Sequence, residues 1–325
     1  MENKFLDKIK KNFYNTFPQL SESSRKIVIR NLLLLYKKIN GDENIKSLNF
    51  IYNKNKVIDS IKDLNYLTQR NYYHMLNYII KSNLKSEKSK KILEFYLSKR
   101  EALNNQYNTV VANNEMSEKT QKNWITMEEY DKMLSRIKLI IDSFDFDKIG
   151  KRETTLFQKY LILNIYKYHP MRLDLHDMKI IDEKEDNKDI SDNYNYMIKL
   201  ENGNFKFKIL NFKTKKTHKE IVININPKLN DIINKYLKIN KSEYFITQER
   251  NQMLPIKKQA LANYIARIFK KYTGKDIGVN MIRKLVVSDR FAEIDKQQKK
   301  LAKEMGHQIG TQQNYLKYSD SDKAS

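Results

Sequence analysis

The feature that most constrains the fold is a change in the spacing of apolar residues near the middle of the chain. Most of the 325-residue sequence repeats apolar residues every three or four positions, as amphipathic helices do. The spacing then becomes alternating in three runs, Tyr194–Ile198, Phe205–Ile209 and Ile221–Ile225. Asn202-Gly203 separates the first two runs and favours a type I′ hairpin, because both residues tolerate positive φ. The sequence predicts a mainly helical α+β fold with a three-stranded antiparallel sheet near 194–225.

The first 104 residues have helical spacing throughout, which predicts a small helical bundle. Ser21 to Ser24 offer an N-cap for its first helix, and Thr68 offers one for a later helix. We expect helices at Lys26–Ile39, Asn55–Asp63, Gln69–Lys81 and Ser86–Arg100. Such a bundle suits DNA binding or contacts with other proteins. Residues 105–123 are polar, with Asn-Asn pairs and few large apolar side chains, and are expected to form a linker.

A second domain is expected from Trp124 to the end of the chain, over 124–325. Thr126 and Glu129 form a capping box, in which the two side chains satisfy free amides at a helix start. The acidic run Asp182–Asp189 is expected to be a solvated loop. Helices of this domain are expected at Met127–Ser143, Glu153–Tyr168, Lys228–Tyr236, Lys257–Tyr272, Val279–Phe291 and Asp295–Glu304.

Charge is the strongest global indication of a partner. The chain has 62 Lys and Arg against 39 Asp and Glu, a net charge of +23. Residues 1–110 hold 21 basic and 10 acidic groups and residues 201–310 hold 24 and 10, whereas residues 111–200 hold 15 and 17. Two basic blocks therefore flank a neutral one, which favours a polyanion such as double-stranded DNA. The competing explanation is that richness in Lys and Asn reflects an AT-rich genome.

Composition also narrows the classes of protein. The absence of cysteine excludes disulfides and thiolate metal sites, and fits an intracellular compartment. Neither a run of 18 apolar residues nor a charged-then-apolar leader is present, so we expect an unexported protein that does not bind membranes. There is no phosphate-cradling glycine loop and no obvious metal cluster, so no cofactor or small-molecule substrate is expected.

The end of the chain holds the residues best suited to chemistry. Gly306-His307 is followed by Tyr315 and Tyr318, and a tyrosine is then the natural nucleophile for a phosphodiester. That reaction needs cations on the non-bridging phosphate oxygens and a proton donor for the leaving oxygen. Arginine suits the first task because its planar fork holds two oxygens, and lysine suits the second. In an ordinary helical domain, the same histidine caps a helix and the same tyrosines pack.

Three positions elsewhere could supply these cations. Arg172 follows Pro170 at a helix end, where Asp174 could brace its guanidinium. Arg283 lies within an apolar helix, where it forms a salt bridge or faces a bound anion. Lys213 lies in the turn between the second and third alternating runs, although a charged turn is common without any function.

In this order the motifs resemble the tyrosine recombinase/integrase family, in its divergent branch of viruses, virophages and mobile elements. The resemblance covers about residues 20–320. Arg172 matches the arginine after the second catalytic helix, and Lys213 matches the lysine of a β-hairpin. The segment Asn280-Met281-Ile282-Arg283 matches the family's His-x-x-Arg box, and Gly306-His307 with Thr311 and Tyr315 matches its final motif.

The resemblance implies a core-binding domain and a catalytic domain that clamp duplex DNA, in a homo-tetramer on two duplexes. It implies site-specific DNA integration or recombination through a 3′-phosphotyrosyl intermediate, with no metal or other cofactor. Tyr315 would be the nucleophile and Lys213 the proton donor to the leaving 5′-oxygen. Arg172, Arg283 and His307 would stabilise the transition state, with Asn280 assisting.

The sequence departs from the family pattern at two places. Asn280 replaces the usual histidine, so it can donate a hydrogen bond but cannot act as an acid or base. Tyr315 follows His307 by eight positions where the family usually has nine, which keeps Tyr318 as an alternative nucleophile. Two other functions stay open: a DNA-binding or architectural protein that has lost activity, and a resolvase or topoisomerase-like enzyme with the same nucleophile.

Overall fold

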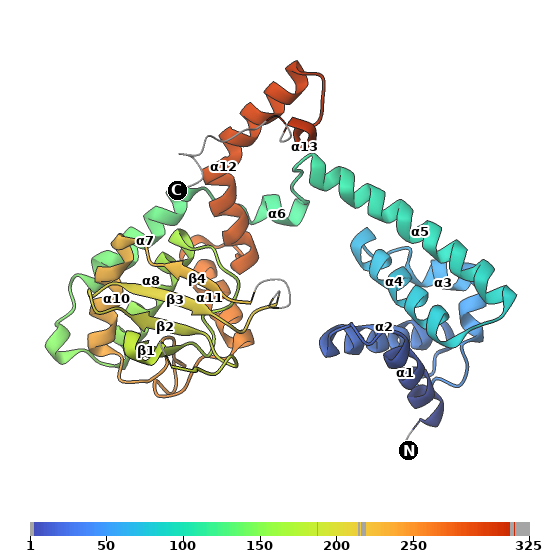
Figure 1. Ribbon diagram of the computed structural model, residues 1–325, viewed down its shortest axis with the longest axis horizontal. Coiled ribbons are helices and arrows are strands. Elements are labelled where there is room, and N and C mark those ends of the chain that lie inside the picture. The colour runs from blue at the N-terminus through green and yellow to red at the C-terminus, as the bar shows by residue number, and fades with distance from the viewer. Residues whose placement is uncertain (1–2, 187, 214, 216–218, 313–314, 316–325) are drawn as a thin grey trace. The chain divides into compact units, whose positions relative to one another are not determined.

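The computed structural model describes residues 3–186, 188–213, 215, 219–312 and 315 (Figure 1). The chain divides into two compact units, unit 1 over Met1–Glu115 and unit 2 over Met116–Ser325. Each unit buries its own cluster of apolar side chains. The expected fold class is confirmed, because the described residues are mostly helical and contain one small sheet.

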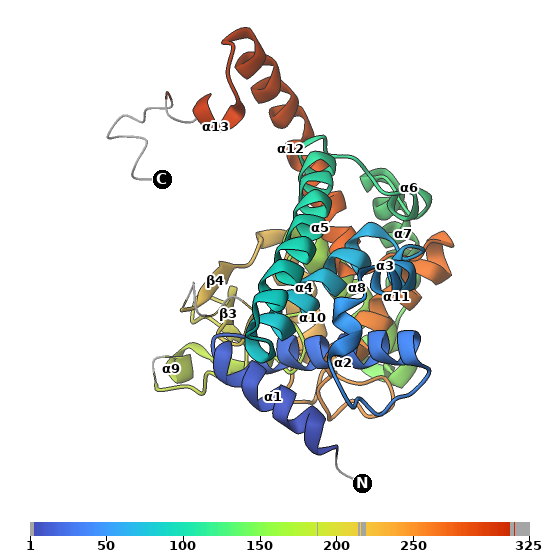
Figure 2. The same cartoon turned by 90° about the vertical axis from the view of Figure 1, so that its right-hand side faces the viewer.

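Unit 1 is a helical bundle in which each apolar face packs on a shared core. The long helices α4 and α5 lie alongside each other (Figure 2), and Tyr73 stacks on Tyr96 between them at 5.9 Å. Ser21 caps α2 as expected, whereas α4 begins at Tyr66, two residues before Thr68, and takes its cap from Asn65. The elements are α1 (Lys4–Thr16), α2 (Glu22–Asn40), η1 (Asn49–Tyr52), α3 (Lys54–Ile61), α4 (Tyr66–Asn83) and α5 (Glu87–Ala112).

The polar stretch at 105–123 is mostly helical. Helix α5 continues to Ala112, twelve residues beyond the expected end at Arg100, and α6 follows at Glu118–Lys122. Residues 105–109 are all exposed, so this part of α5 extends beyond the core of unit 1 and needs no apolar face. Polarity at these positions therefore reflected exposure and not the absence of regular structure.

Unit 2 surrounds a four-stranded sheet with helices. The capping box of Thr126 and Glu129 is confirmed at the start of α7. The strands are β1 (Lys179–Asp182), β2 (Tyr196–Lys199), β3 (Phe205–Ile209) and β4 (Ile221–Asn224), in that spatial order. The other elements are α7 (Met127–Ile141), η2 (Phe146–Lys148), α8 (Lys151–Tyr168), α9 (Glu183–Asp186), α10 (Pro227–Ile239), α11 (Lys258–Thr273), α12 (Val279–Glu304) and α13 (Ile309–Gln312).

The sheet differs from the expected one in two respects. The three antiparallel runs pair as expected, but β1 adds a fourth strand parallel to β2, so the sheet is mixed. The β2–β3 turn is not type I′. The carbonyl oxygen of Leu200 accepts from the N–H of Gly203 over 3.0 Å, and positive φ occurs at Gly203 but not at Asn202. This is a three-residue loop that places only its glycine in the left-handed region.

The acidic run at 182–189 is not a free loop over its described residues. Helix α9 brings the carboxylate of Asp186 against β3, where Lys206 lies 2.9 Å and Lys208 2.8 Å from it. Burial acts to raise the pKa of Asp186, but hydrogen bonds from Lys208 and Lys206 outweigh it and hold the pKa below its usual value. Lys206 and Lys208, which lie on the same face of β3, thus both form ion pairs with Asp186.

The two helices expected at Val279–Phe291 and Asp295–Glu304 are one continuous helix, α12, of 26 residues. The residues between the expected pieces, Ala292-Glu293-Ile294, contain neither proline nor glycine and do not interrupt the backbone hydrogen bonds. At 1.5 Å per residue α12 is roughly 39 Å long. Its first turns pack on α8, α7 and α11, and its far end extends away from the sheet (Figure 1).

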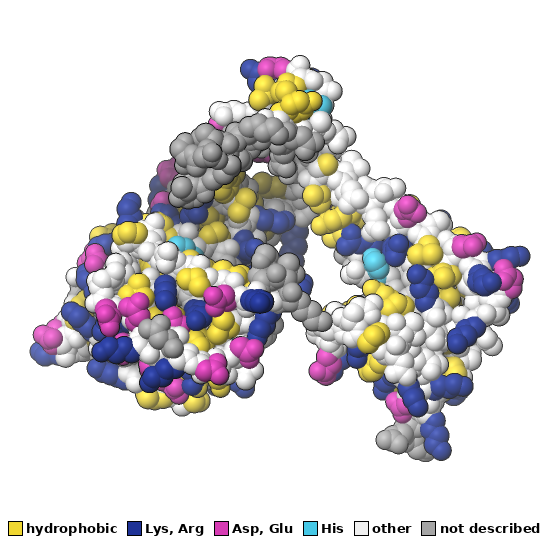
Figure 3. Space-filling model, viewed as in Figure 1, with side chains coloured by type: hydrophobic (Ala, Val, Ile, Leu, Met, Phe, Trp, Pro, Cys, Tyr) yellow, Lys and Arg dark blue, Asp and Glu magenta, His cyan; other side chains and the backbone are white. Residues whose placement is uncertain are grey.

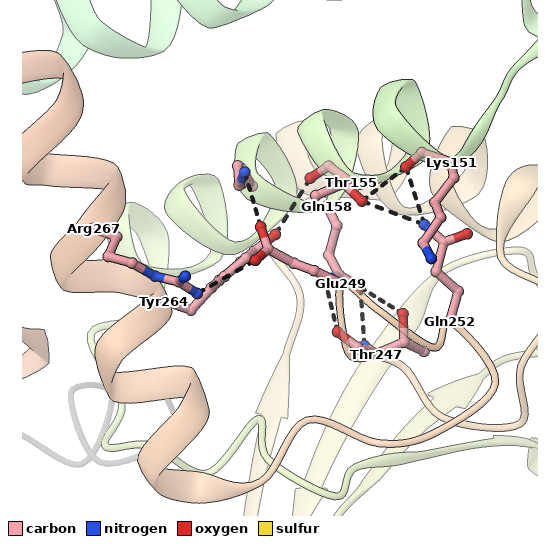
Figure 4. A network of polar contacts seen from close by, with 9 residues as sticks. Lys151, Thr155, Gln158, Thr247, Glu249, Gln252, Tyr264 and Arg267 are labelled. Atoms are coloured by element: carbon pink, nitrogen blue, oxygen red, sulfur yellow. Dashed lines mark hydrogen bonds and ion pairs between the residues drawn. The ribbon is translucent and has the colours of Figure 1, made fainter.

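A buried polar network fixes the loop that leads into α11 (Figure 4). The side-chain oxygen of Gln158 on α8 accepts from the hydroxyl of Tyr236 over 2.7 Å and from the N–H of Thr247 over 2.9 Å. Next to it, Glu249 pairs with Lys159 at 3.0 Å and with Arg267 of α11 at 3.3 Å. The network ties α8, the loop and α11 together, and α12 packs against the same helices.

Candidate active site

Helix α12 is attached to the turn that carries Arg172. Helix α8 ends at Tyr168, and the next residues run through Pro170 to Arg172 without regular structure. The Nε of Arg283, one turn into α12, donates to the carbonyl oxygen of Pro170 over 3.0 Å. The side chain of Arg283 therefore contacts the backbone two residues before Arg172.

Both arginines keep most of their hydrogen-bonding capacity. Arg172 is exposed and Arg283 is half-buried. Among the described residues, no carboxylate lies within salt-bridge distance of either guanidinium, and the terminal nitrogens of Arg283 make no hydrogen bond. A half-buried guanidinium that is held through Nε alone presents its remaining donors to an anion. This arrangement differs from the salt bridge that was the alternative for Arg283.

Two buried side chains fix the backbone of Arg172. The hydroxyl of Tyr166 donates to the carbonyl oxygen of Arg172 over 2.8 Å. The carboxylate of Asp174 accepts from the backbone N–H of Arg172. Burial raises the pKa of Asp174, although the nearby charges of Lys258, His176 and Arg172 act in the opposite direction. Asp174 thus acts on Arg172 through the peptide and through charge, without a salt bridge to its guanidinium among the described residues.

A buried asparagine joins the Arg172 turn to the segment that carries Lys213. The side-chain amide of Asn195 donates to the carbonyl oxygen of Asp174 over 2.9 Å. Its side-chain oxygen accepts from the backbone N–H of Leu210 over 3.0 Å and of Asn211 over 2.8 Å. Two residues later Lys213 is exposed at the start of the β3–β4 connection. Asn195 therefore fixes the spacing between the two cationic segments, and sequence reasoning had placed it only as a strand residue.

Asn280 lies in the first turn of α12 and is exposed. Helix positions three apart are neighbours on one face, so Asn280 and Arg283 lie one above the other. Within the described residues, Arg283 thus lies against the turn that carries Arg172, and Asn280 lies one turn before Arg283 on the same helix. Lys213 lies on a segment that Asn195 joins to the Arg172 turn.

His307 and Tyr315 form a separate pair at the other end of α12. Gly306, with φ +71°, ends the helix in a Schellman motif: its N–H bonds the carbonyl oxygen of Lys303, and the N–H of His307 bonds that of Ala302. The rings of His307 and Tyr315 stack at 5.5 Å with 9° between their planes. The Nε2 of His307 is buried and has no partner in the described structure, and Tyr315 is 64% exposed.

The candidate residues are therefore not in one place within a single chain. From Arg283 to the end of α12 the helix extends roughly 30 Å. Figure 1 shows α13, which follows His307, at the end of α12 away from the sheet. Tyr318 lies outside the described residues. The structure places the arginines and the histidine–tyrosine pair at opposite ends of one helix.

Two residues near the arginines had no predicted role. Arg290 donates to the carbonyl oxygens of Lys167 at 2.9 Å and Tyr168 at 3.1 Å, the free carbonyl groups at the end of α8. The Nε2 of His169 accepts from the N–H of Asn226 over 3.1 Å. Burial and then the charge of Arg290 lower the pKa of His169. Arg290 could have been found from the sequence, because it follows Arg283 by two helical turns.

The described residues contain neither a candidate metal site nor a candidate membrane-spanning helix. No group of three or more potential metal-ligating side chains occurs among the described residues. Within the same residues, no helix has the length and apolar character needed to cross a membrane.

Comparison with known proteins finds matches among solved structures alone. No protein-family model matches the chain, and no curated protein matches it in sequence. Among solved structures it resembles XerA recombinase, with 13% identity and a TM-score of 0.35 over 98% of this chain and 96% of that one. Because this likeness is so distant, any function proposed for the chain has to be argued from its own residues.

Proposed function

We propose that the protein is a tyrosine-type, site-specific DNA recombinase that integrates a viral or mobile-element genome. The single observation that supports this most is the contact between Arg283 and Pro170. It places the guanidinium of Arg283 beside the turn that carries Arg172, and neither arginine has a salt-bridge partner among the described residues. Two such guanidinium groups are suited to stabilise the negative charge on the non-bridging oxygens of a phosphodiester in its transition state.

In the proposed reaction the phenolic oxygen of Tyr315 attacks the scissile phosphorus and the bond to the 5′-oxygen breaks. Lys213 gives its proton to that leaving oxygen, and the phenol proton passes to solvent. Arg172, Arg283 and His307 hold the non-bridging oxygens, with a hydrogen bond from Asn280. The 5′-hydroxyl of a second strand then reverses the step, so one phosphodiester replaces another and the phosphotyrosyl bond conserves the energy. Double-stranded DNA supplies all the reacting atoms.

The separation along α12 leads us to place Tyr315 opposite the arginines of a second copy. Helix α12 contains neither proline nor glycine, the usual causes of a sharp kink. Its exposed side carries apolar side chains, each about half exposed, at alternating spacings of three and four with Gln298 at the one polar position. They are Val287, Phe291, Ile294, Leu301 and Met305.

That spacing is the seam of a two-helix contact. Because the seam is symmetric about residue 296, an antiparallel second α12 would set Phe291 against Leu301 and Arg290 close to Glu304 of the other copy. A helix pair of this kind fits an assembly of several copies on DNA, with a tetramer as the proposed form. The end of each α12 would then lie beyond its own unit, free to approach a neighbour.

The experiment that tests this function uses a nicked duplex substrate, from which the cleaved strand cannot be rejoined. We expect a covalent adduct between protein and DNA, and mass spectrometry should assign the linked peptide to Tyr315. An adduct at Tyr318 would move the nucleophile, and no adduct with any substrate bound by the protein would reject the proposed reaction.

One observation favours a second function, a DNA-binding protein of the same fold without activity. Asn280 stands where the family has histidine, and the described structure keeps His307 and Tyr315 far from the arginines. The nicked-substrate experiment separates the two functions, because an architectural protein would bind the duplex and never form an adduct.

A further inference from the structure

Unit 1 carries a cluster of cationic side chains between its two longest helices. Arg70 and His74 lie on α4, four positions apart and therefore on one face of the helix. Arg100 and Tyr107 lie on α5, two helical turns apart and also on one face. Because α4 and α5 lie alongside each other (Figures 1 and 2), the two faces meet.

One direct contact and the electrostatics of His74 link the four side chains. The guanidinium of Arg70 lies over the ring of Tyr107, 4.6 Å from its centre. Burial, then the charge of Arg100 and then that of Arg70, lower the pKa of His74. Two guanidinium groups thus act on one half-buried imidazole, and no carboxylate contributes to the shift.

The cluster has no protein anion to balance it. Within the described residues, no Asp or Glu lies within salt-bridge distance of Arg70 or Arg100, and neither guanidinium makes a hydrogen bond. The Nε atoms of both are buried without a partner. An unsatisfied buried donor of this kind destabilises the fold, and more so when it is charged.

A buried amide on the same face has the same deficit. Asn77 follows His74 by three positions on α4 and is only 4% exposed. Both its side-chain nitrogen and its side-chain oxygen lack a hydrogen-bond partner. Most buried polar side chains in proteins are paired, so an unpaired amide beside two unpaired arginines indicates a group that is added from outside.

The chain offers a contrast in Arg25 of α2. Its guanidinium also lies on an aromatic ring, 5.0 Å from the centre of Tyr14. Its Nε is also buried without a partner, but, in contrast to Arg70, its terminal nitrogen donates to the carbonyl oxygens of Pro18 at 2.7 Å and Phe17 at 3.3 Å. Arg25 therefore already binds the backbone of its own unit through that nitrogen, and it serves as a matched control for the cluster.

We propose that Arg70, His74 and Arg100 form a binding site for one phosphodiester group of a nucleic-acid backbone. The guanidinium forks supply paired donors for its two non-bridging oxygens, and the neutral imidazole supplies one more N–H. The ring of Tyr107 lies against the guanidinium of Arg70 and limits its movement. The nature of the ligand rests on the proposed function and on the net positive charge of residues 1–110, with 21 basic against 10 acidic groups. Lys and Arg side chains are spread over the face of unit 1 that Figure 3 shows.

The test measures binding of the full-length protein to a fluorescent 30-base-pair duplex over a range of salt concentrations. One neutralised phosphate contributes a slope of about 0.9 to the plot of log affinity against log salt. Replacing both arginines, as Arg70→Gln with Arg100→Gln, should weaken binding and lower the slope by about 0.9 in total. The control Arg25→Gln should leave the slope unchanged.

Other outcomes overturn the inference. An unchanged slope removes the cluster from the DNA contact, and a fall of about 1.8 means two separate phosphate contacts instead of one shared site. A wild-type protein that does not bind the duplex also rejects it. Adduct formation at Tyr315 is a separate measurement, so a cluster that binds DNA in a protein without cleavage activity would keep this inference and reject the proposed reaction.

A second measurement does not depend on the folding of a variant. Titration of the wild-type protein by NMR should show the pKa of His74 rising when the duplex is added, because an anion between the arginines offsets their charge. Inorganic phosphate at equal phosphate concentration should raise it less. A larger rise with inorganic phosphate would mean a site for a free anion, and no rise with the duplex would contradict the proposal.

Discussion

The side-chain amide of Asn195 donates to the carbonyl oxygen of Asp174 over 2.9 Å, and this bond joins the two segments that carry Arg172 and Lys213. The same side chain accepts from the backbone N–H groups of Leu210 and Asn211. Asn195 is 2% exposed, so water cannot replace any of these bonds. A residue just before β2, without chemistry of its own, therefore joins the two segments of the candidate site.

Replacing Asn195 with Ala should destabilise unit 2 and misplace Lys213. Two backbone N–H groups and a carbonyl lose their partner in a buried place, which we expect to cost about 2–4 kcal/mol. Unfolding by denaturant, followed by circular dichroism, should show the transition of unit 2 at a lower denaturant concentration than in the wild-type protein. Asn263→Ala, at an exposed position of α11, is the control and should change stability little. Equal stability of the two variants would show that the Asn195 bonds are not needed.

Replacing Arg283 with Ala should reduce cleavage much more than DNA affinity. The side chain holds the Pro170 carbonyl through Nε and has two terminal nitrogens for the phosphate, so both positioning and charge are lost. Arg283→Lys should also fail to cleave, because lysine has no planar fork. We expect a fall of about 10²-fold or more in the rate of adduct formation, by analogy with the loss of an oxyanion donor. Equal losses of rate and affinity would mean that Arg283 only positions DNA.

A mixture of two inactive variants should regain activity if Tyr315 acts on the site of a second copy. Tyr315→Phe lacks the nucleophile and Arg283→Ala lacks the phosphate contact, yet one copy of each can form a complete site. The expected result is adduct formation on the Arg283→Ala chain alone, resolved by a size tag. Absence of any adduct in the mixture, with each variant still binding DNA, would place the whole site within one chain.

The apolar side of α12 should control self-association. Phe291→Ser with Leu301→Ser removes two side chains that are each about half exposed and face each other in the proposed antiparallel pair. Sedimentation of the protein on DNA should then show smaller assemblies, with DNA affinity of the single copy retained. Leu139→Ser removes a 72% exposed apolar residue elsewhere and should have no such effect.

Asp186 should contribute to stability at neutral pH and not in acid. Its pKa is lowered in the folded state by Lys208 and Lys206, so the contribution is complete above the unfolded pKa of about 3.9 and is lost as pH falls through the folded value. Asp186→Asn should therefore lower the melting temperature at pH 7 and much less at pH 2. The exposed Asp189→Asn is the control. A loss of the same size at both pH values would exclude the charge as its cause.

Local patterns determined most of the elements. Three strands followed from alternating apolar residues, and the start of α7 followed from Thr126 and Glu129, because each signal lies within a few residues of the chain. Strand β1 was not predicted, because its residues, Lys179-Ile180-Ile181-Asp182, do not alternate between apolar and polar. Its parallel pairing with β2 defines it as a strand, and a sequence pattern does not.

The residue types available for chemistry, the basic charge and the helical frame could all be predicted from the sequence, since these depend on composition and on neighbours along the chain. Which of these residues meet depended on how the chain packs. Tertiary packing brought Arg283 to the turn of Arg172 and joined Lys213 to that turn through Asn195, yet kept His307 and Tyr315 at the far end of an unbroken α12. The physical reason is that contacts between distant segments depend on packing and on buried hydrogen bonds, and no spacing along the chain encodes them.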